Sequence, residues 1–310
     1  MRATRLPMLE SMTIQSPYAE LLATIETTNH SVELLGGTTR YWVYGPSDAR
    51  DTVIIAHGYR GEHHGIEPII AYLPEVRFIS PDLPGFGEST PLTGAAHSID
   101  GYATWLRMFV DAVAPGGRAI ILGHSFGSIV TASAVAAGLR TPGLILINPI
   151  AVSGLAGPRP FVTKLTLAYY ALAGRLPEKL GRALLGNRLI VQFMSVSLAK
   201  TKNPALRRWI HREHHTYFSR FASRDVVVEG FRASISTDVS AFARRIRVPT
   251  LLVAANLDDI TPIAAQFHLE KALLDARLVV LEGVGHLIHY EVPHLAADAI
   301  GAFLVELRRR

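Results

Sequence analysis

The sequence contains no cysteine among its 310 residues. This absence excludes disulfide bonds, thiolate metal sites and a cysteine nucleophile. Long apolar runs are also missing: the most apolar stretch outside the expected strands, residues 165–173, is far shorter than the roughly 20 residues that a membrane-spanning helix needs. Residues 1–21 mix arginine and glutamate with apolar residues and offer no apolar core for a signal peptide. We therefore expect a cytoplasmic location and no transmembrane segment.

Charged side chains are scarce as well, at 18% of residues against 49% hydrophobic residues. This balance is typical of a chain that folds around a packed core, and its length suits one large α/β domain with an insertion or two modest domains. The formal net charge is +5, but no nucleic-acid motif is present and the basic residues are not interleaved with aromatic residues along one element. We expect no nucleic-acid partner.

Short apolar runs rich in β-branched residues follow one another along the chain. Residues 31–35 and 38–44 flank a Gly-Gly turn and predict a hairpin. Runs typical of strands buried on both faces then occur at residues 52–56, 76–81, 119–122, 143–148, 249–254 and 276–281. Helical patterns lie between or after them at residues 98–113, 125–137, 263–274 and 293–307. This alternation predicts an α/β fold with a doubly wound, mostly parallel sheet.

One interval breaks the alternation. Residues 150–241 contain helical patterns interrupted by prolines and no convincing strand, and we interpret them as an inserted helical cap. The α/β core would then comprise residues 31–149 and 242–310. Residues 1–30 would form a mostly helical N-terminal extension.

The clearest chemical motif is the turn Gly123-His124-Ser125-Phe126-Gly127. An expected strand precedes it and an expected helix follows it, which is the context in which a Gly-x-Ser-x-Gly turn carries a nucleophilic serine. The two glycines allow strand and helix to approach closely, so that Ser125 can adopt a strained backbone angle and project its hydroxyl above the sheet. Such a turn also arises by chance, and it predicts a nucleophile only if a base and an acid accompany it.

A base and an acid follow in order along the chain. A serine hydroxyl needs an adjacent base, and that base needs a carboxylate to hold its tautomer and stabilise its charged form. The expected strand at 249–254 leads into Asp258 and Asp259, and the next strand leads into His286 on a glycine-rich loop. Both loops follow the carboxyl ends of strands, where sites in open α/β sheets form.

At this point the sequence resembles the α/β-hydrolase family over nearly its whole length after the first thirty residues. The turn at residues 57–61, His-Gly-Tyr-Arg-Gly, resembles the family's oxyanion loop, and residues 82–89, Asp-Leu-Pro-Gly-Phe-Gly-Glu-Ser, resemble the turn after its next strand. The resemblance implies that Ser125 attacks the substrate and that His286 acts as general base and then acid. It also implies that the backbone amides of Tyr59 and Phe126 bind the oxyanion.

The same resemblance bears on the acid. In the family this aspartate commonly lies four residues before a proline, which selects Asp258 ahead of Pro262 and makes Asp259 the alternative. Some members carry the acid after the strand that precedes the cap, but that strand here ends in Asn148, which has no carboxylate. The aspartate nucleophile of haloalkane dehalogenases and epoxide hydrolases is absent, so the resemblance argues against those reactions.

Several polar residues near these motifs have plainer interpretations. The resemblance departs from the family at Arg60, where many members have proline, and a positive charge there would lie near the pocket mouth. His57 and His124 are expected to support loop packing, and His289 and His294 to be surface or helix-capping groups. The cap residues His211, Glu213, His214 and His215 contain ligand types for a metal but lack the His-Glu-x-x-His spacing. We expect a solvated face there, no metal and no cofactor.

The expected cap differs from the rest of the chain in charge. It holds 14 basic and 5 acidic residues, a net charge of +9 against +5 for the whole sequence, so the remainder carries −4. Such a cap is either a well-solvated surface or a region that attracts an anionic substrate or makes transient contact with an acidic membrane surface. Its apolar residues would line an acyl or aromatic pocket or form the cap's own core: Leu165, Leu167, Tyr169, Tyr170, Leu172, Phe193, Met194, Tyr217, Phe218 and Phe221.

These patterns predict a serine hydrolase that forms an acyl-enzyme on carboxylic esters with a hydrophobic acyl or aromatic portion. A carbon–carbon bond hydrolase of the meta-cleavage-product type would use the same three residues and a helical cap. Amide hydrolysis would call for a carboxylate in the cap, for which Glu213 and Glu229 are candidates. A non-catalytic, hydrolase-like receptor for a small molecule is the alternative outside enzymes, although a binder has no need of Ser125, Asp258 and His286 together.

Overall fold

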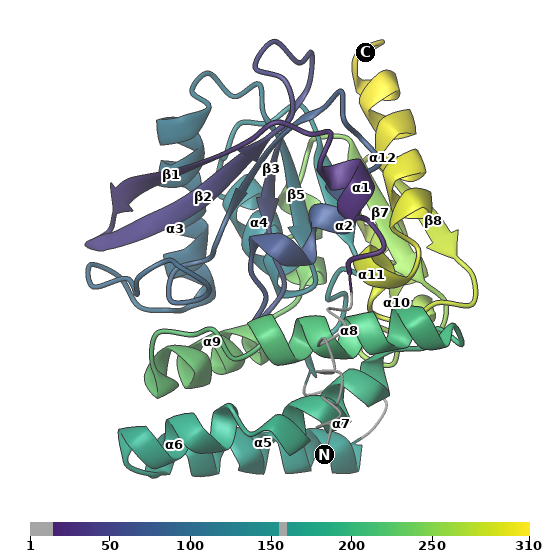
Figure 1. The fold of residues 1–310 in the computed structure, drawn as a ribbon. Helices are drawn as coiled ribbons and strands as arrows, with labels where there is room; N and C mark the ends of the chain where they lie inside the picture. The colour runs from purple at the N-terminus through teal and green to yellow at the C-terminus, as the bar shows by residue number, and fades with distance from the viewer. Residues whose placement is uncertain (1–14, 155–159) are drawn as a thin grey trace, which may run out of the picture.

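The chain forms one eight-stranded mixed sheet covered by helices, shown in Figure 1. This structure is a computed structural model and describes residues 15–154 and 160–310. The strand order is β1-β2-β4-β3-β5-β6-β7-β8, with β2 antiparallel to both of its neighbours and all other pairs parallel. The strands are β1 Thr27–Leu34, β2 Gly37–Tyr44, β3 Thr52–Ala56, β4 Arg77–Pro81, β5 Ile120–His124, β6 Leu144–Ile147, β7 Thr250–Ala255 and β8 Ala276–Leu281. The doubly wound, mostly parallel sheet predicted from the sequence is confirmed.

The core strands bury both of their faces, which explains their nearly continuous apolar sequences. In β3, Ile54 packs into one hydrophobic cluster while its neighbours Val53 and Ile55 pack into another. The first cluster receives helices α3 and α4 and includes residues of α10, and the second receives α2 and α12. These helices are α2 Glu67–Ile70, α3 Ile99–Val113, α4 Phe126–Ala136, α10 Ile263–Ala272 and α12 Pro293–Leu307.

The N-terminal hairpin differs from the prediction at its start. Strand β1 begins at Thr27, four residues before the expected Ser31, and its first residues are exposed on both faces. No apolar alternation therefore marks this end of the strand, which is defined by its pairing with β2 from Thr27 opposite Tyr44 onward. The expected mostly helical lead-in is also wrong within its described part, where α1 spans only Ala19–Leu22. Residues 1–14 of that lead-in lie outside the described residues.

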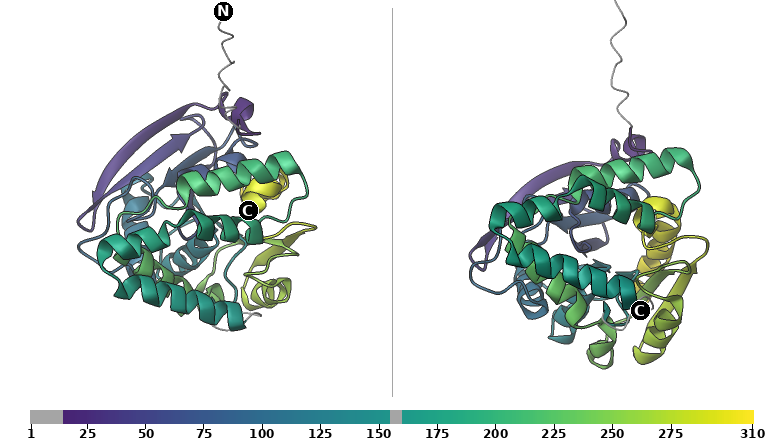
Figure 2. Two further views of the ribbon diagram at one scale, coloured as in Figure 1. Left: turned by 60° about the horizontal axis from the view of Figure 1, so that its bottom comes forward. Right: turned by 90° about the horizontal axis from the view of Figure 1, so that it is seen from below.

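In the described part of the chain, five α-helices stand between β6 and β7 and lie across one end of the sheet (Figure 1). They are α5 Pro160–Arg175, α6 Glu178–Leu185, α7 Arg188–Leu198, α8 Pro204–Tyr217 and α9 Arg224–Ser236. Figure 2 shows them from below, in front of the sheet. Within the described part of this interval the only β pairing is a single bridge between Phe221 and Phe86 of the core. The helical insert predicted from the sequence is confirmed, and we call it the cap.

The described residues also form the short helices η1 His63–Gly65, η3 Val239–Ala241, η4 Ala243–Arg245 and α11 Ile288–Glu291. Among the described residues, no helix combines the length and the apolar character needed to cross a membrane.

Candidate active site

Ser125 lies on a sharp turn between β5 and α4. Its backbone conformation is one that residues other than glycine rarely adopt. Its φ is 52° and its ψ is −117°, outside the regions that L residues prefer. The neighbouring glycines make this turn possible: a Cβ at Gly127 would lie 1.9 Å from the carbonyl oxygen of Ala56, and one at Gly123 would lie 2.4 Å from Thr131 Oγ1. The strand and the helix therefore meet at a distance that only glycine permits.

The structure brings the three side chains predicted for the site into one hydrogen-bonded row. The Ser125 hydroxyl donates to Nε2 of His286 over 2.9 Å. Nδ1 of His286 donates to Oδ2 of Asp258 over 2.7 Å. Loops after β5, β7 and β8 supply the three residues, so the parallel sheet aligns them at the end that the cap covers. This arrangement suits a serine whose proton passes to an imidazole oriented by a carboxylate.

Asp258 is held as an anion by several donors. Its Oδ1 accepts from the backbone amides of Ile260 at 2.7 Å and Thr261 at 3.1 Å, and the Thr261 hydroxyl donates to Oδ2 over 2.6 Å. Burial alone would raise the pKa of Asp258, but His286 and these donors outweigh it and hold the pKa below its usual value. Asp259, the alternative acid, accepts a bond of 2.6 Å from Lys200 Nζ. The geometry therefore pairs His286 with Asp258.

Asn148 is a site residue that the sequence analysis noted only for lacking a carboxylate. Its φ is 42° and it is buried at the end of β6. Its side-chain amide donates to the carbonyl oxygen of His286 over 2.9 Å, and its Oδ1 accepts from the amide of Ala255 over 2.9 Å. Asn148 thus ties the histidine loop to the end of β7. No sequence signal marked this role, because both partners lie more than 100 residues away.

His57 and Asp82 organise the loops on the other side of Ser125. Nδ1 of His57 donates to the carbonyl oxygen of Gly58 and its Nε2 accepts from the amide of Leu83, both over 2.8 Å. This pattern fixes one neutral tautomer, and burial lowers the pKa of His57. Asp82 accepts from the amide and the ring of His63, each over 2.8 Å. The two sequence motifs at 57–61 and 82–89 therefore hold each other in place.

The amides predicted to bind an oxyanion belong to segments that flank Ser125. Phe126 is the first residue of α4, where backbone amides have no partner within the helix. Tyr59 follows Gly58, where an added Cβ would lie 3.4 Å from Ser125 Cβ, so this loop passes close to the serine. The Tyr59 ring is fixed by a bond of 2.6 Å from its hydroxyl to the carbonyl oxygen of Val227 in the cap.

Arg60 lines a cavity beside Ser125, but its charge is buried and not exposed at a pocket mouth as expected. Its side chain is buried between core and cap. Nη2 donates to the carbonyl oxygen of Leu185 over 2.8 Å, Nε donates to that of Phe218 over 3.1 Å, and the guanidinium lies 4.1 Å from the centre of the Phe218 ring. The guanidinium thus joins the loop after β3 to the ends of α6 and α8, a role that depends on cap segments distant in sequence.

Two cavities of different character meet at Ser125 and His286. The larger has a volume of about 740 Å³ and is lined mainly by apolar side chains of the cap. Six of the ten apolar cap residues named from the sequence line it: Leu165, Leu167, Tyr169, Tyr170, Phe193 and Met194. Of the others, Leu172 is exposed, Phe221 belongs to the hydrophobic core, and Tyr217 and Phe218 line the smaller cavity.

The smaller cavity has a volume of about 100 Å³, and we call it the polar chamber because several titratable side chains line it, although most of its wall is apolar. Its lining includes His124, His289, Glu213 and His214 together with Ser125. Burial lowers the pKa of His124 to about 3 and that of His214 to about 4, and it raises the pKa of Glu213. Burial therefore keeps the two histidines uncharged near neutral pH, and Arg212 partly opposes the effect of burial on Glu213.

His289 corrects a second expectation, since it is neither a surface group nor a helix cap. It is buried, and its ring packs against His124 with centroids 4.4 Å apart. Burial and the neighbouring histidines hold the pKa of His289 well below its usual value. His294, considered with it, is exposed as expected.

The histidine cluster of the cap is also less solvated than expected. Nδ1 of His211 and Nδ1 of His214 each lie 2.6 Å from the hydroxyl oxygen of Ser195, and Nε2 of His215 lies 2.7 Å from Oε1 of Gln192. Because Ser195 is buried on α7, these half-buried rings join α8 to α7, and the face that they form is only partly solvated. Nothing in the sequence indicated that Ser195 would bond to these histidines.

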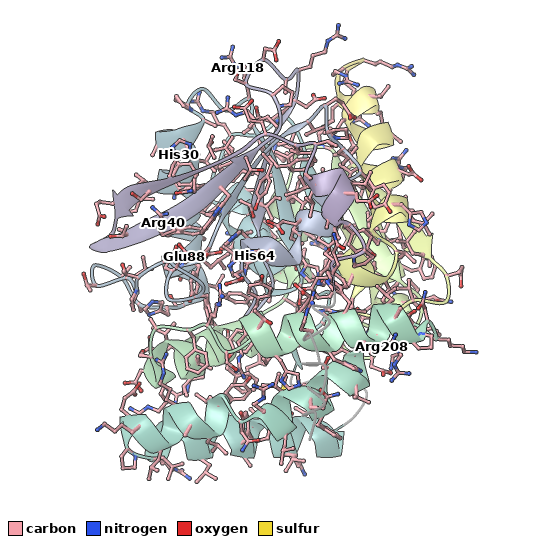
Figure 3. The ribbon with its side chains drawn as sticks, in the orientation of Figure 1. His30, Arg40, His64, Glu88, Arg118 and Arg208 are labelled. Atoms are coloured by element: carbon pink, nitrogen blue, oxygen red, sulfur yellow. The ribbon has the colours of Figure 1, made fainter. Side chains whose placement is uncertain are left out.

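Within the described ranges, one cluster has the spacing of metal ligands, namely Glu62, His63 and His64. Figure 3 shows His64 where the sheet approaches the cap. Nδ1 of His63 bonds to Asp82, and Nδ1 of His64 bonds to Oε1 of Glu62 over 2.5 Å. These three side chains are already engaged in hydrogen bonds that hold the loop.

A family model supports the same conclusion as the fold. The model of the alpha/beta hydrolase family matches residues 53–299, well over half of the sequence. The chain belongs to the α/β hydrolase family. Among curated proteins it is similar to "Putative carbamate hydrolase RutD" of Pseudomonas syringae pv. syringae, with 27% identity over 271 residues that cover 87% of this chain and 90% of that protein.

Solved structures share the fold across several activities. The structure is similar to a thermophilic esterase from Thermogutta terrifontis, with a TM-score of 0.72, 21% identity and coverage of 91% and 99% of the two chains. It is equally similar to the epoxide hydrolase CorEH, with a TM-score of 0.72, 19% identity and coverage of 91% and 100%. At this level of identity the likeness concerns the fold, and the bond that is cleaved must be argued from the site.

Proposed function

We propose that this α/β hydrolase is a serine esterase that cleaves carboxylic esters with a hydrophobic acyl or aromatic portion. The observation that carries the proposal is the hydrogen-bonded row from Ser125 through His286 to Asp258 beside an apolar cavity. A protein that merely bound a small molecule would have no use for a strained serine with an oriented base. Serine at this position also argues against the epoxide chemistry of CorEH.

The reaction would proceed in two halves. Ser125 Oγ attacks the ester carbonyl carbon while His286 Nε2 takes its proton, and Asp258 stabilises the imidazolium that forms. The amides of Tyr59 and Phe126 would bind the developing oxyanion, an interaction worth about 3–4 kcal/mol per donor in serine hydrolases. His286 then protonates the leaving alcohol. In the second half a water molecule, activated by His286, releases the acid and restores Ser125.

The two cavities suggest how a substrate would lie. The apolar cavity of about 740 Å³ has room for a large acyl or aromatic group. The polar chamber, at about 100 Å³, offers space for a small polar alcohol or for roughly three water molecules at about 30 Å³ each. Substrates with a bulky apolar acid and a small polar alcohol would match both volumes.

Hydrolysis of an amide or carbamate is a second candidate, because one observation favours it. Amide hydrolysis was expected to require a carboxylate in the cap, and Glu213 lines the polar chamber. Glu229, the other candidate, is half-exposed and lies 3.2 Å from Nδ1 of His97, away from the chamber lining. Carbamate hydrolysis is also the activity in the name of the RutD relative.

Active-site labelling tests the nucleophile. A fluorophosphonate probe should label the wild-type protein, and labelling should be lost in Ser125→Ala and His286→Ala. Ser240→Ala, which removes a serine hydroxyl bonded to the carbonyl oxygen of Ala151, is the matched control and should label normally. Undiminished labelling of Ser125→Ala would overturn the nucleophile.

A substrate panel tests the bond. We expect kcat/KM on p-nitrophenyl esters to rise as the acyl chain lengthens from two to about eight carbons. The same enzyme preparation is then assayed on matched amides, carbamates and a dienoic carbon–carbon substrate. A preference for acetate esters would contradict the apolar acyl site, and turnover confined to another bond type would contradict the esterase proposal.

A further inference from the structure

Helix α5 turns an apolar stripe toward solvent. Its exposed residues recur at helical spacing from Lys164 and Leu165 through Ala168 to Leu172 and Arg175. The side chains of Leu165 and Leu172 are 63% and 52% exposed. A helix that packs on a globular core normally turns its polar face outward, so this stripe is unusual for a surface that meets only water.

Helix α7 repeats the pattern. Leu189, Phe193 and Val196 follow one another at spacings of four and three residues, and they are 79%, 74% and 45% exposed. Leu189 and Phe193, like Leu165 of α5, also line the larger cavity. Because these three residues border the same cavity and are exposed, the two stripes meet at its mouth. Contiguous exposed apolar residues of this kind mark interaction sites.

The charged residues of the two helices themselves have one sign. Neither α5 nor α7 contains an aspartate or glutamate, while Lys164 and Arg175 bound the stripe of α5 and Arg188 opens α7. All three basic residues are exposed. They belong to a cap whose net charge is +9. A face that is apolar along its centre and basic at its edges complements an apolar layer beneath a negatively charged surface.

We propose that this face, formed by the outward stripes of α5 and α7 with Lys164, Arg175 and Arg188, docks onto anionic lipid membranes. Helices with leucine and phenylalanine on one side and basic residues beside them lie in the membrane interface and insert the apolar side chains among the headgroups. Each lysine or arginine near an anionic leaflet contributes about 1 kcal/mol of attraction. The mouth of the cavity would then open toward the lipid, so apolar substrates could reach Ser125 from the membrane.

The charges also argue against a second copy of this chain as the occupant. In a two-fold dimer the same patch faces itself, so the basic residues of one copy would approach those of the other. Like charges brought together at an interface oppose association. An anionic surface meets no such repulsion.

Vesicle co-sedimentation tests the proposal without depending on catalysis, because it is measured in the Ser125→Ala background. We expect binding to vesicles of phosphatidylcholine with 30% phosphatidylglycerol, and at least tenfold weaker binding to phosphatidylcholine alone. Leu172→Glu combined with Val196→Glu, two positions outside the cavity lining, should abolish binding. The control is Leu274→Glu, which introduces the same charge at an exposed leucine just ahead of β8. Leu274 is 65% exposed, and this variant should bind normally.

A second pair separates charge from apolar contact. Lys164→Glu with Arg175→Glu should weaken binding at least tenfold, whereas Arg118→Glu, at the end of the molecule opposite the cap in Figure 3, should not. Equal binding by the double variants and wild type would overturn the proposal. So would sedimentation showing that wild type is a dimer which Leu172→Glu with Val196→Glu converts to monomers. Vesicle binding with no hydrolysis of any ester would sink the proposed function and leave this inference standing.

Discussion

At the scale of single residues, two adjacent aspartates have different surroundings. Asp258 accepts three hydrogen bonds from its own loop and a fourth from Nδ1 of His286. Asp259 bonds to Lys200 of the cap. One carboxylate is thus directed at the imidazole, and the other at a cation 59 residues earlier in the chain.

Asp258→Asn should lower kcat by about 10⁴-fold, because an amide at this position favours the wrong histidine tautomer. Asp259→Asn keeps the size of the side chain and should lower kcat less than about fivefold, since this pair is partly exposed and such pairs contribute at most about 1 kcal/mol. Both are measured as kcat on the best ester of the panel. A larger loss in Asp259→Asn than in Asp258→Asn would mean that the acid is assigned to the wrong residue.

Sequence patterns indicated the polar site residues that follow the ends of strands. They did not indicate the polar residues whose roles depend on being buried between core and cap. Ser125, Asp258 and His286 stand directly after apolar strands, and parallel strands deliver such residues to one edge of a sheet. The roles of Arg60 and His289 arise because segments far along the chain cover them. A charge or an imidazole is usually at the surface, so sequence alone gave the wrong environment for both.

At the scale of elements, the close contact between β3, β5 and α4 holds the turn at Ser125 in its strained conformation. Gly127→Ala should lower the free energy of unfolding by at least about 2 kcal/mol, because its Cβ would lie 1.9 Å from the backbone of Ala56 and the helix would have to shift. Hydrolase activity should fall with it, as the shift moves Ser125 away from His286.

The control for this substitution is Gly301→Ala on α12, where a Cβ would meet Leu73 at an ordinary 3.6 Å. It should leave activity unchanged and raise stability by up to about 1 kcal/mol, since alanine favours helix more than glycine does. Urea denaturation measures both variants. Equal effects of the two substitutions would show that the contact at Gly127 is not the constraint.

The elements that were predicted well are those buried on both faces. Strands such as β3 and β7 are continuous in apolar residues, so their positions follow from composition alone. The first half of β1 was not predicted. An exposed edge strand is held by hydrogen bonds to its neighbour and can form without an apolar pattern in its sequence. The helical character of the cap as a whole was recognisable from the sequence. Which of its apolar residues line the cavity and which belong to the core depends on tertiary packing, so the sequence did not indicate it.

At the scale of the whole molecule, buried neutral histidines couple stability to pH. His124 and His214, with pKa values lowered to about 3 and about 4, stay neutral in the folded protein but take up protons near pH 6.5 when it unfolds. The unfolded state therefore binds more protons between about pH 6.5 and pH 4, and stability falls as the pH falls through this window. His64, whose pKa is raised beside Glu62, contributes in the opposite sense.

We expect the free energy of unfolding to be lower at pH 5 than at pH 7, by up to about 2 kcal/mol for each histidine of this kind. Urea denaturation at several pH values measures the change. His214→Gln should make the dependence shallower, because it removes one of the groups that must stay neutral. A stability that is constant or increases toward pH 5 would contradict this account.

The amide of Asn148 bears on how such a site can change over evolutionary time. Relatives that carry their acid at the corresponding strand end have a carboxylate there, so one mutation would seem enough to move the acid between the two places. Here that side chain donates to the carbonyl oxygen of His286, and an aspartate would bring two acceptors face to face. The histidine loop would lose its anchor at the same step that gained a carboxylate. Moving the acid to the end of β6 would therefore also call for a new hydrogen bond to hold the loop after β8.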